Sequence, residues 1–263
     1  MKIVSFILLV PFLCRPALGQ AKSAWVTAKS GCEVREGTLI DADNNWRGND
    51  IPPVAQVYYV MVRCDPTSVR ISILDTAGVL GKENAYAAYS VREVAKNTGA
   101  SVVVNAGSTA SYSTPIPVGL LIVRGLVISK TNLKATHGAI LCVGKKGVTI
   151  GPLSQQRPTP KGCSYAVQGG PLLSRDFKEA DSNRTRRTIA AIDKKGRLII
   201  LVTKSNTFLS SLRSLLYDSS SDLEIQSALN LDGGMSSGIM FAQRGVVGSV
   251  DNLVASVIVI AGR

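Results

Sequence analysis

The chain lacks a long apolar run beyond its N-terminal segment. A helix that crosses a bilayer needs about 20 consecutive apolar residues, and no segment after residue 19 meets that requirement. We therefore expect a soluble mature protein without a transmembrane anchor. Internal repeats and low-complexity tracts are also absent, so one domain is the simplest organisation for a chain of this length.

Histidine is nearly absent, and His137 is its single instance. Residues 234–238 read G-x-S-x-G, a pattern that in serine hydrolases needs a strand–turn–helix context and a triad histidine after the serine. Here an apolar strand follows the motif and His137 precedes it, so we exclude a serine hydrolase and interpret His137 as structural. The cysteine spacings match no zinc-binding pattern.

The N-terminal segment has the features of a secretory signal peptide. Lys2 gives a positive start, residues 3–13 are apolar, and Ala17-Leu18-Gly19 offers small residues for cleavage. The apolar stretch is too short to span a bilayer. We expect cleavage after Gly19 and a periplasmic or secreted location.

Four cysteines remain beyond residue 19. An even number of cysteines in an exported protein predicts disulfides, and four cysteines allow three pairings. We expect Cys32–Cys64 and Cys142–Cys163, because each of these pairs closes a local stretch of chain.

Basic residues outnumber acidic ones, 30 against 18, which gives a formal net charge of +12. Such an excess attracts anionic partners at long range. Outside the cytosol the expected partners are phosphorylated carbohydrates and anionic envelope glycans, and no nucleic acid partner is expected.

Short β-rich segments dominate the remaining pattern. Runs of β-branched residues predict strands at 34–40, 54–62, 69–74 and 101–105, and a hairpin that turns at Lys194-Lys195-Gly196. Residues 41–53 read as a polar linker. We expect an α+β fold class, a single domain built on a mixed, strongly twisted β-sheet with a few helices.

Apolar spacing places the expected helices. One helix is predicted over residues 87–98 and ends at Gly99, and a second follows Asn206. Ser221 and Glu224 form a capping-box pair, which predicts a short third helix through Ala228.

The most informative stretch is residues 228–238, ALNLDGGMSSG. Asp232 follows an apolar strand and precedes Gly233 and Gly234, whose backbone N–H groups can approach an anion closely. Ser236 and Ser237 add hydroxyl donors. A purely structural Asp-Gly turn would produce the same short pattern.

Three other segments combine strand ends with glycine or arginine. They are Asn105-Ala106-Gly107, Gln168-Gly169-Gly170-Pro171, and the group Arg184, Arg186 and Arg187 ahead of Thr188. An arginine at the root of a strand can grip phosphate through two N–H groups. Arginines on a solvated face would have no such role.

In chain order these segments resemble the phosphodiester glycosidase family. The resemblance spans residue 101 to the C-terminus and rests on Asn105-x-Gly107, Pro117-x-Gly119-Leu120-Leu121, Gly169-Gly170-Pro171-Leu172-Leu173, Arg187-Thr188 and Asn230-Leu231-Asp232-Gly233-Gly234-x-Ser236-Ser237. The family has Asn-Gly-Gly followed by aromatics where this chain has Ala106 and Ser108-Thr109. After the signal peptide at 1–19 and the N-terminal strand and linker at 20–53, which the residues themselves indicate, the resemblance implies a phosphodiester glycosidase-like domain that we place at 54–263.

The family likeness and the residue types together imply an exported hydrolase that cleaves an N-acetylglucosamine-like sugar from a sugar-1-phosphodiester. Asp232, Arg187 and Asn105 are the expected catalytic residues, with Asp232 as the carboxylate and Arg187 on the phosphate. The expected substrate- and phosphate-binding residues are Gly107, Gln168, Gly169, Gly170, Gly233, Gly234, Ser236 and Ser237.

Two other functions fit the same residues. A non-catalytic periplasmic module for phosphorylated envelope glycans would use the same anion-binding glycines, and a structural envelope component would use them only as turns. No cofactor is expected and no metal is required, although Asp232 with nearby carbonyls could bind a hard cation such as calcium.

Overall fold

A computed structural model describes residues 23–28, 31–41, 55–76, 89–113, 115–133, 138–153, 160–177 and 183–263. The expected signal peptide, most of the expected linker and His137 lie outside these described residues.

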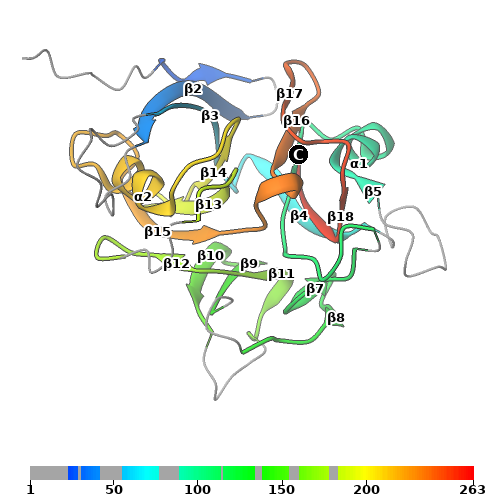
Figure 1. The fold of residues 1–263 in the computed structure, drawn as a ribbon. Helices are drawn as coiled ribbons and strands as arrows, with labels where there is room; N and C mark the ends of the chain where they lie inside the picture. Colours follow the sequence, from blue (N-terminus) through cyan, green and yellow to red (C-terminus); the bar gives the residue numbers. More distant parts are fainter. Residues whose placement is uncertain are drawn as a thin grey trace, which may run out of the picture.

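Strands dominate the described residues and form three larger sheets and one short one (Figure 1). The seven-stranded sheet has the order β1 (Val26–Thr27), β2 (Cys32–Asp41), β3 (Ala55–Cys64), β14 (Leu198–Thr203), β13 (Thr188–Asp193), β15 (Ile225–Asn230) and β12 (Leu172–Leu173).

Two further sheets have five strands each. The β11 sheet has the order β10 (Gly147–Pro152), β9 (Ala139–Gly144), β11 (Cys163–Gly169), β7 (Leu121–Val123) and β8 (Leu126–Ser129). The β6 sheet has the order β17 (Gly245–Gly248), β16 (Gly238–Phe241), β6 (Val102–Asn105), β19 (Ser256–Gly262) and β4 (Val69–Asp75). The short sheet pairs β18 (Leu253–Val254) with β5 (Tyr89–Ser90).

The inner faces of the three larger sheets share one apolar core. Representative buried members are Val60 and Ile200 of the seven-stranded sheet, Leu141 and Val167 of the β11 sheet, and Val104 and Ile258 of the β6 sheet. Burial of such β-branched and leucine side chains is the main favourable contribution to folding.

Two α-helices among the described residues cover outer sheet faces (Figure 1). Helix α2 (Leu209–Tyr217) packs Leu212 and Leu216 against the seven-stranded sheet. Helix α1 (Val91–Thr98) packs Val91 and Val94 against the β6 sheet. Strands β13 and β14 lie between the core and α2 and are therefore buried along their whole length.

The first predicted helix is confirmed, in the shortened range of α1. Ser90 and Glu93 form a capping box at its start. Its C-cap, Gly99, has a φ of 61°, a left-handed conformation that favours glycine. The second predicted helix is also confirmed, but Phe208 and not Asn206 occupies its N-cap.

Two features of the predicted fold differ from the structure. The predicted helix through Ala228 is wrong, because residues 225–230 form β15 and pair with β13 and β12. Glu224 has a φ of 46°, which ends any helical path before the strand. All strand pairings among the described residues are antiparallel, so the expected mixture of parallel and antiparallel strands is not observed, and the strands are divided among several sheets.

The predicted hairpin at Lys194-Lys195-Gly196 is confirmed between β13 and β14. Asp193 stabilises its turn by accepting hydrogen bonds from the backbone N–H groups of Lys195 and Arg197, each at 2.9 Å. Both predicted disulfides are also present, Cys32–Cys64 between neighbouring strands β2 and β3, and Cys142–Cys163 between β9 and β11.

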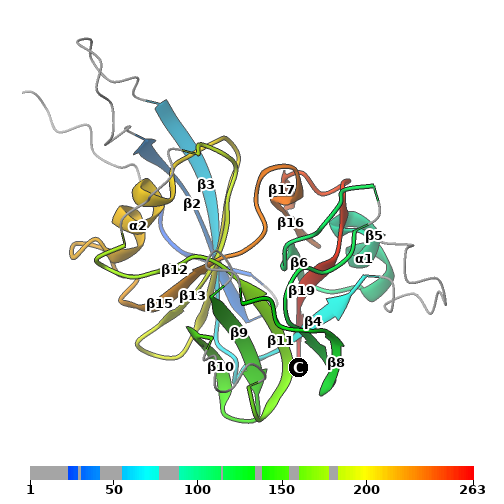
Figure 2. The ribbon, with the colours of Figure 1, turned by 60° about the horizontal axis from the view of Figure 1, so that its bottom comes forward.

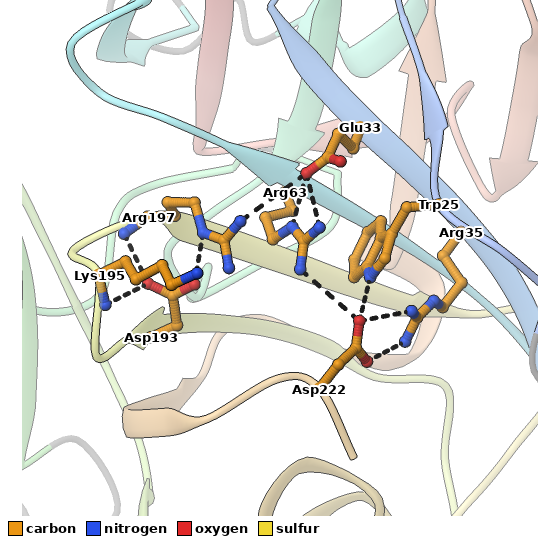
Figure 3. A network of polar contacts seen from close by, with 8 residues as sticks. All are labelled: Trp25, Glu33, Arg35, Arg63, Asp193, Lys195, Arg197 and Asp222. Atoms are coloured by element: carbon orange, nitrogen blue, oxygen red, sulfur yellow. Dashed lines mark hydrogen bonds and ion pairs between the residues drawn. The ribbon is translucent and has the colours of Figure 1, made fainter.

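A polar network attaches residues 23–28 to the rest of the sheet (Figure 3). The Trp25 ring lies between the guanidinium groups of Arg35 and Arg63, 4.3 and 4.1 Å from its centroid. Asp222 accepts a hydrogen bond from the indole N–H at 2.7 Å and pairs with both terminal nitrogens of Arg35, also at 2.7 Å. The segment before β2 is thereby held by residues nearly two hundred positions later in the chain.

None of the helices in the described part of the chain has both the length and the apolar character that a membrane span requires.

Candidate active site

The candidate site forms where β15 ends and the chain crosses from the seven-stranded sheet to the β6 sheet (Figure 2). Three backbone hydrogen bonds hold this crossing. Leu231 N–H donates to the Thr188 carbonyl at 2.9 Å, Asp232 N–H to the Ala106 carbonyl at 2.9 Å, and Gly234 N–H to the Arg186 carbonyl at 2.8 Å. Strand ends that are far apart in sequence therefore meet around Asp232.

Asn105 lies behind this crossing and is fully buried. Its side-chain N–H donates to the Asp232 carbonyl at 2.8 Å, and its side-chain oxygen accepts from the Thr188 hydroxyl at 2.8 Å and from the Gly238 N–H at 3.1 Å. The residue thus links β6, β13 and β16 to the backbone of Asp232.

Asp232 itself is partly buried. Its Oδ1 accepts a hydrogen bond from the Gly233 N–H at 3.1 Å. Burial raises the pKa of the carboxyl to about 6, against the opposing effects of the Ser236 hydroxyl and the Gly233 N–H. Such a carboxyl exchanges its proton close to neutral pH.

The crossing segment also holds a cluster of buried polar atoms. Seven buried side-chain polar atoms of the described residues have no hydrogen-bond partner, and four of them belong to residues 230–237: Asn230 Oδ1, Asp232 Oδ2, Ser236 Oγ and Ser237 Oγ. The Ser236 hydroxyl is close enough to lower the pKa of Asp232 but does not have hydrogen-bond geometry toward it. Unpaired buried polar atoms are uncommon and costly, so a cluster of them points to a place for a ligand or ordered water.

The three arginines ahead of β13 point to different places. Arg184 pairs with Asp41 at 2.8 Å. Arg187 is buried and donates to the carbonyls of Asn183 and Thr207, at 2.5 and 3.4 Å.

Arg186 is the arginine whose side chain follows the crossing segment. Its Nη1 donates to the Ser249 hydroxyl at 2.6 Å, and the Ser249 N–H donates to the Ser237 carbonyl at 2.7 Å. Its own carbonyl would lie 2.9 Å from a Cβ placed at Gly233, which explains why glycine occupies that position.

The second glycine pair lies at the end of β11, beside β15. Gly170 N–H donates to the Asn230 carbonyl at 2.8 Å, and a Cβ at Gly169 would come within 2.6 Å of that same oxygen. Gln168 is fully buried, and its side-chain oxygen accepts from the backbone N–H groups of Leu120 and Asn132, at 2.9 and 3.0 Å. The side chain of Gln168 thus joins the backbone at Leu120 to the backbone at Asn132.

Gly107 also contributes to the backbone framework. Its N–H donates to the Ser256 hydroxyl at 2.9 Å, and a Cβ there would come within 2.8 Å of Val167. The predicted site residues are therefore neighbours, but most of them use their polar groups within the protein. This holds for the side chains of Asn105, Gln168 and Arg187 and for the backbone N–H groups of Gly107, Gly170, Gly233 and Gly234.

Tyr112 is a site residue that the sequence analysis missed. It is 47% exposed and lies on the loop that follows β6. Burial, and then the charge of Asp232, raise the pKa of its phenol, so the two side chains are within electrostatic reach. The signal was available: the family pattern has aromatics after Asn-x-Gly, and this chain has its aromatic a few residues further along.

The described residues contain no group of three or more histidine, cysteine, aspartate or glutamate side chains that could hold an ion.

The family model of the phosphodiester glycosidases matches residues 98–261, more than half of the chain. This range contains all the strand ends that meet at Asp232. The chain belongs to the phosphodiester glycosidase family. Among curated protein sequences none matches this family member.

Solved structures share its fold. The catalytic domain of zebrafish N-acetylglucosamine-1-phosphodiester alpha-N-acetylglucosaminidase, auto-inhibited by its pro-peptide, has a TM-score of 0.67 at 17% identity, over 93% of this chain and 88% of that one. A Burkholderia pseudomallei K96243 protein whose name describes it as exported has a TM-score of 0.65 at 11% identity, over 93% and 97% of the two chains. A hypothetical protein from Synechocystis has a TM-score of 0.54 at 14% identity, over 88% and 62%. At these sequence identities the similarity shows a shared fold.

Proposed function

We propose that this phosphodiester glycosidase family member hydrolyses a sugar-1-phosphodiester and releases a free, N-acetylglucosamine-like sugar. The observation that carries the proposal is the carboxyl of Asp232, whose pKa is about 6 and whose Oδ2 is one of four buried polar atoms of this segment without partners. A purely structural Asp-Gly turn does not require a buried carboxyl, and burial of a carboxylate is energetically unfavourable.

The reaction needs a base more than it needs an acid. The bond between the sugar C1 and the phosphate oxygen breaks, and the oxygen leaves with the electron pair as a phosphomonoester, which is a weak base and needs little protonation. Water supplies the new C1–O bond. At neutral pH the Asp232 carboxylate takes the water proton and stabilises positive charge at the sugar carbon.

Phosphate would be held next to the crossing segment. Arg186 is the better placed arginine, because its guanidinium donates to Ser249, whose backbone N–H bonds the Ser237 carbonyl, whereas Arg187 donates to protein carbonyls. The hydroxyls of Ser236 and Ser237 lie in the same segment and have no hydrogen-bond partner within the described residues, whereas the Gly233 N–H donates to the Asp232 carboxyl. We assign Asn105 and Gln168 to positioning, since each is fully buried and hydrogen-bonded to backbone.

The sugar would face the loop that carries Tyr112. Its half-exposed ring offers an apolar surface of the kind on which a sugar ring stacks, within electrostatic reach of Asp232. Two disulfides and the expected signal peptide support action outside the cytosol, in the periplasm or after secretion.

The test is release of free sugar from N-acetylglucosamine-1-phosphomethyl diester and a panel of other sugar-1-phosphodiesters. Asp232→Asn keeps the side-chain shape and removes the base, so kcat should fall by about 10²- to 10⁴-fold. Asp251→Asn is the matched control, because Asp251 is exposed and pairs with Arg92; its activity should equal that of the wild type. Full activity in Asp232→Asn would refute the assignment of the base.

A non-catalytic binding module remains the second candidate, favoured by the number of site residues that bond only to protein. Absence of sugar release across the whole panel, together with phosphate-ligand binding that Arg186→Ala removes, would establish that function in place of hydrolysis.

A further inference from the structure

One end of the β11 sheet carries a concentration of positive charge that the catalytic proposal does not use. Lys145 and Lys146 form the turn between β9 and β10, Arg124 lies in the turn between β7 and β8, and Lys161 precedes β11. Arg70 and Arg263 stand on the other side of the Lys145-Lys146 turn. These six residues, here called the basic end, are all exposed.

The basic end contains two hollows, one on each side of the Lys145-Lys146 turn. The first has a volume of about 680 Å³ and is lined by Arg70, Arg263 and both lysines. The second has a volume of about 690 Å³ and is lined by Arg124, Lys161 and the same two lysines. No acidic residue of the described chain lines either hollow.

Most of the cations of the basic end have no acidic partner among the described residues. Arg70, Arg124, Lys145, Lys146 and Lys161 form no ion pair there. The exception is Arg263: hydrogen bonds from Thr67 have the larger effect in lowering the pKa of Asp65, and the charge of Arg263 helps to lower it further.

A second turn of the same sequence shows that lysines alone do not create such a surface. Lys194-Lys195-Gly196 turns β13 into β14 as Lys145-Lys146-Gly147 turns β9 into β10. In the former turn Lys194 pairs with Glu224 at 3.7 Å, and Asp193 occupies the turn itself. The two turns thus carry the same number of lysines, but only the Lys194-Lys195 turn has acidic residues beside it.

The basic end lies far from the candidate active site. Strand β11 begins at Cys163, beside Lys161, and ends at Gly169, next to Asn230. At about 3.3 Å per residue this strand separates the two places by roughly 20 Å. A single phosphate group could not contact both.

We propose that the basic end is a second binding site, which holds an anionic polymer bearing phosphate groups at intervals along its chain. Several separate cations arranged around two connected hollows suit a chain that passes over the Lys145-Lys146 turn and places successive phosphates on either side of it. A flat bilayer surface would touch the turns and leave the hollows empty. The site does not depend on the hydrolytic function.

The test uses long-chain inorganic polyphosphate as the probe, with binding measured by isothermal titration calorimetry at several salt concentrations. The full-length mature chain should bind it with an affinity that falls linearly with log salt, as counterions are released. Lys145→Gln combined with Lys146→Gln should weaken binding by about tenfold at low salt and reduce the salt slope by about one to two.

Lys194→Gln combined with Lys195→Gln is the matched control, because it removes the same charge from the same kind of turn. Its affinity should stay within about twofold of the wild type. Equal loss in both double variants would overturn the proposal, since only net charge would matter, and so would the absence of loss in the first variant.

Two further probes distinguish the source of the phosphate. Tripolyphosphate, which is too short to reach both hollows, should bind much more weakly than the long polymer. The contrary result is that the basic end binds phosphatidylglycerol vesicles more strongly than polyphosphate and loses that binding in the Lys145/Lys146 variant. This result would overturn the proposal of a polymer ligand and assign the basic end to a lipid surface.

Discussion

At Asp232 the burial that raises the pKa to about 6 also makes the ionised carboxylate unfavourable in the folded state. The pKa in the unfolded chain is near 3.8, so the folded protein binds the proton more tightly. The free energy of unfolding should therefore fall as pH rises from about 3.8 to 6, by up to about 3 kcal/mol, and stay low above that range.

Asp232→Asn should remove this pH dependence. Urea unfolding is expected to find the variant more stable than the wild type at pH 7 and equal to it below pH 4. Asp251→Asn, at an exposed carboxyl, should show no such gain. A variant that is less stable than the wild type at pH 7 would indicate that the carboxylate is stabilised by an interaction other than those of Gly233 and Ser236.

The two adjacent arginines should respond differently to alanine. Arg186→Ala should raise KM for the phosphodiester by about tenfold or more, because it removes a charged hydrogen-bond donor from phosphate, and should leave the melting temperature nearly unchanged. Arg187→Ala should lower the free energy of unfolding by about 1–3 kcal/mol, since the carbonyls of Asn183 and Thr207 lose their donor. Steady-state kinetics and urea unfolding on both variants check this, and the reverse assignment of effects would return the phosphate to Arg187.

At single residues, the sequence motifs located the candidate site but not the direction of its side chains. The Asp-Gly-Gly segment identified Asp232, because glycine and a carboxyl at a strand end are local features. Whether Asn105 faces a ligand or the protein depends on Thr188 and Gly238, which approach it only after three strands have paired. Tyr112 was missed for a different reason, because the aromatic of this chain stands a few residues further along than in the family pattern.

Among the elements, the network around Asp222 gives a prediction for the N-terminal strands (Figure 3). The hydrogen bonds from Arg35, followed by the one from Trp25, hold the pKa of Asp222 at about 2. Asp222→Asn leaves the buried guanidinium of Arg35 without its full partner, so the free energy of unfolding should fall by about 1–3 kcal/mol.

The pH dependence of this network follows from the lowered pKa. Its contribution should be present above pH 4 and lost as pH falls toward 2, where the folded protein takes up the proton. Urea unfolding of Asp222→Asn and wild type across this range measures it. Asp251→Asn is again the control, because the exposed Arg92–Asp251 pair is screened by solvent and contributes little to stability. An equal decrease in the free energy of unfolding of both variants would mean that the burial of Arg35 does not strengthen its pairing with Asp222.

Helices and turns with strong local sequence signals were predictable, but the pairing of strands that are distant in the sequence was not. The capping box of α1 and the Lys194-Lys195-Gly196 turn are encoded within a few residues, and both predictions were confirmed. The Ser221–Glu224 pair carries an equally good local signal for a helix, but the edges of β12 and β13 on either side pair with residues 225–230 and impose a strand. The division into three sheets depends on such distant pairings throughout.

For the whole molecule, the three sheets explain how the chain can present two separate polar surfaces. The strand ends around Asp232 meet where the seven-stranded and β6 sheets are joined, and the opposite end of the β11 sheet carries the basic end. Strand β11 connects the two and is buried over much of its length. Its rigidity fixes the separation between the two surfaces.

The two disulfides should therefore contribute similarly to stability but differently to function. Each closes a loop of comparable length, with sequence separations of 32 and 21, so removing either should cost about 3–4 kcal/mol in the chain-entropy description. Cys142 and Cys163 also line the second hollow beside Lys161, whereas Cys32 and Cys64 lie in the apolar core. Guanidinium unfolding of Cys32→Ala/Cys64→Ala and Cys142→Ala/Cys163→Ala should thus find comparable losses, while polyphosphate titration should find weaker binding only in the second variant. If the first variant lost polyphosphate affinity to the same degree, the basic end would depend on global stability and not on the local arrangement of its turns.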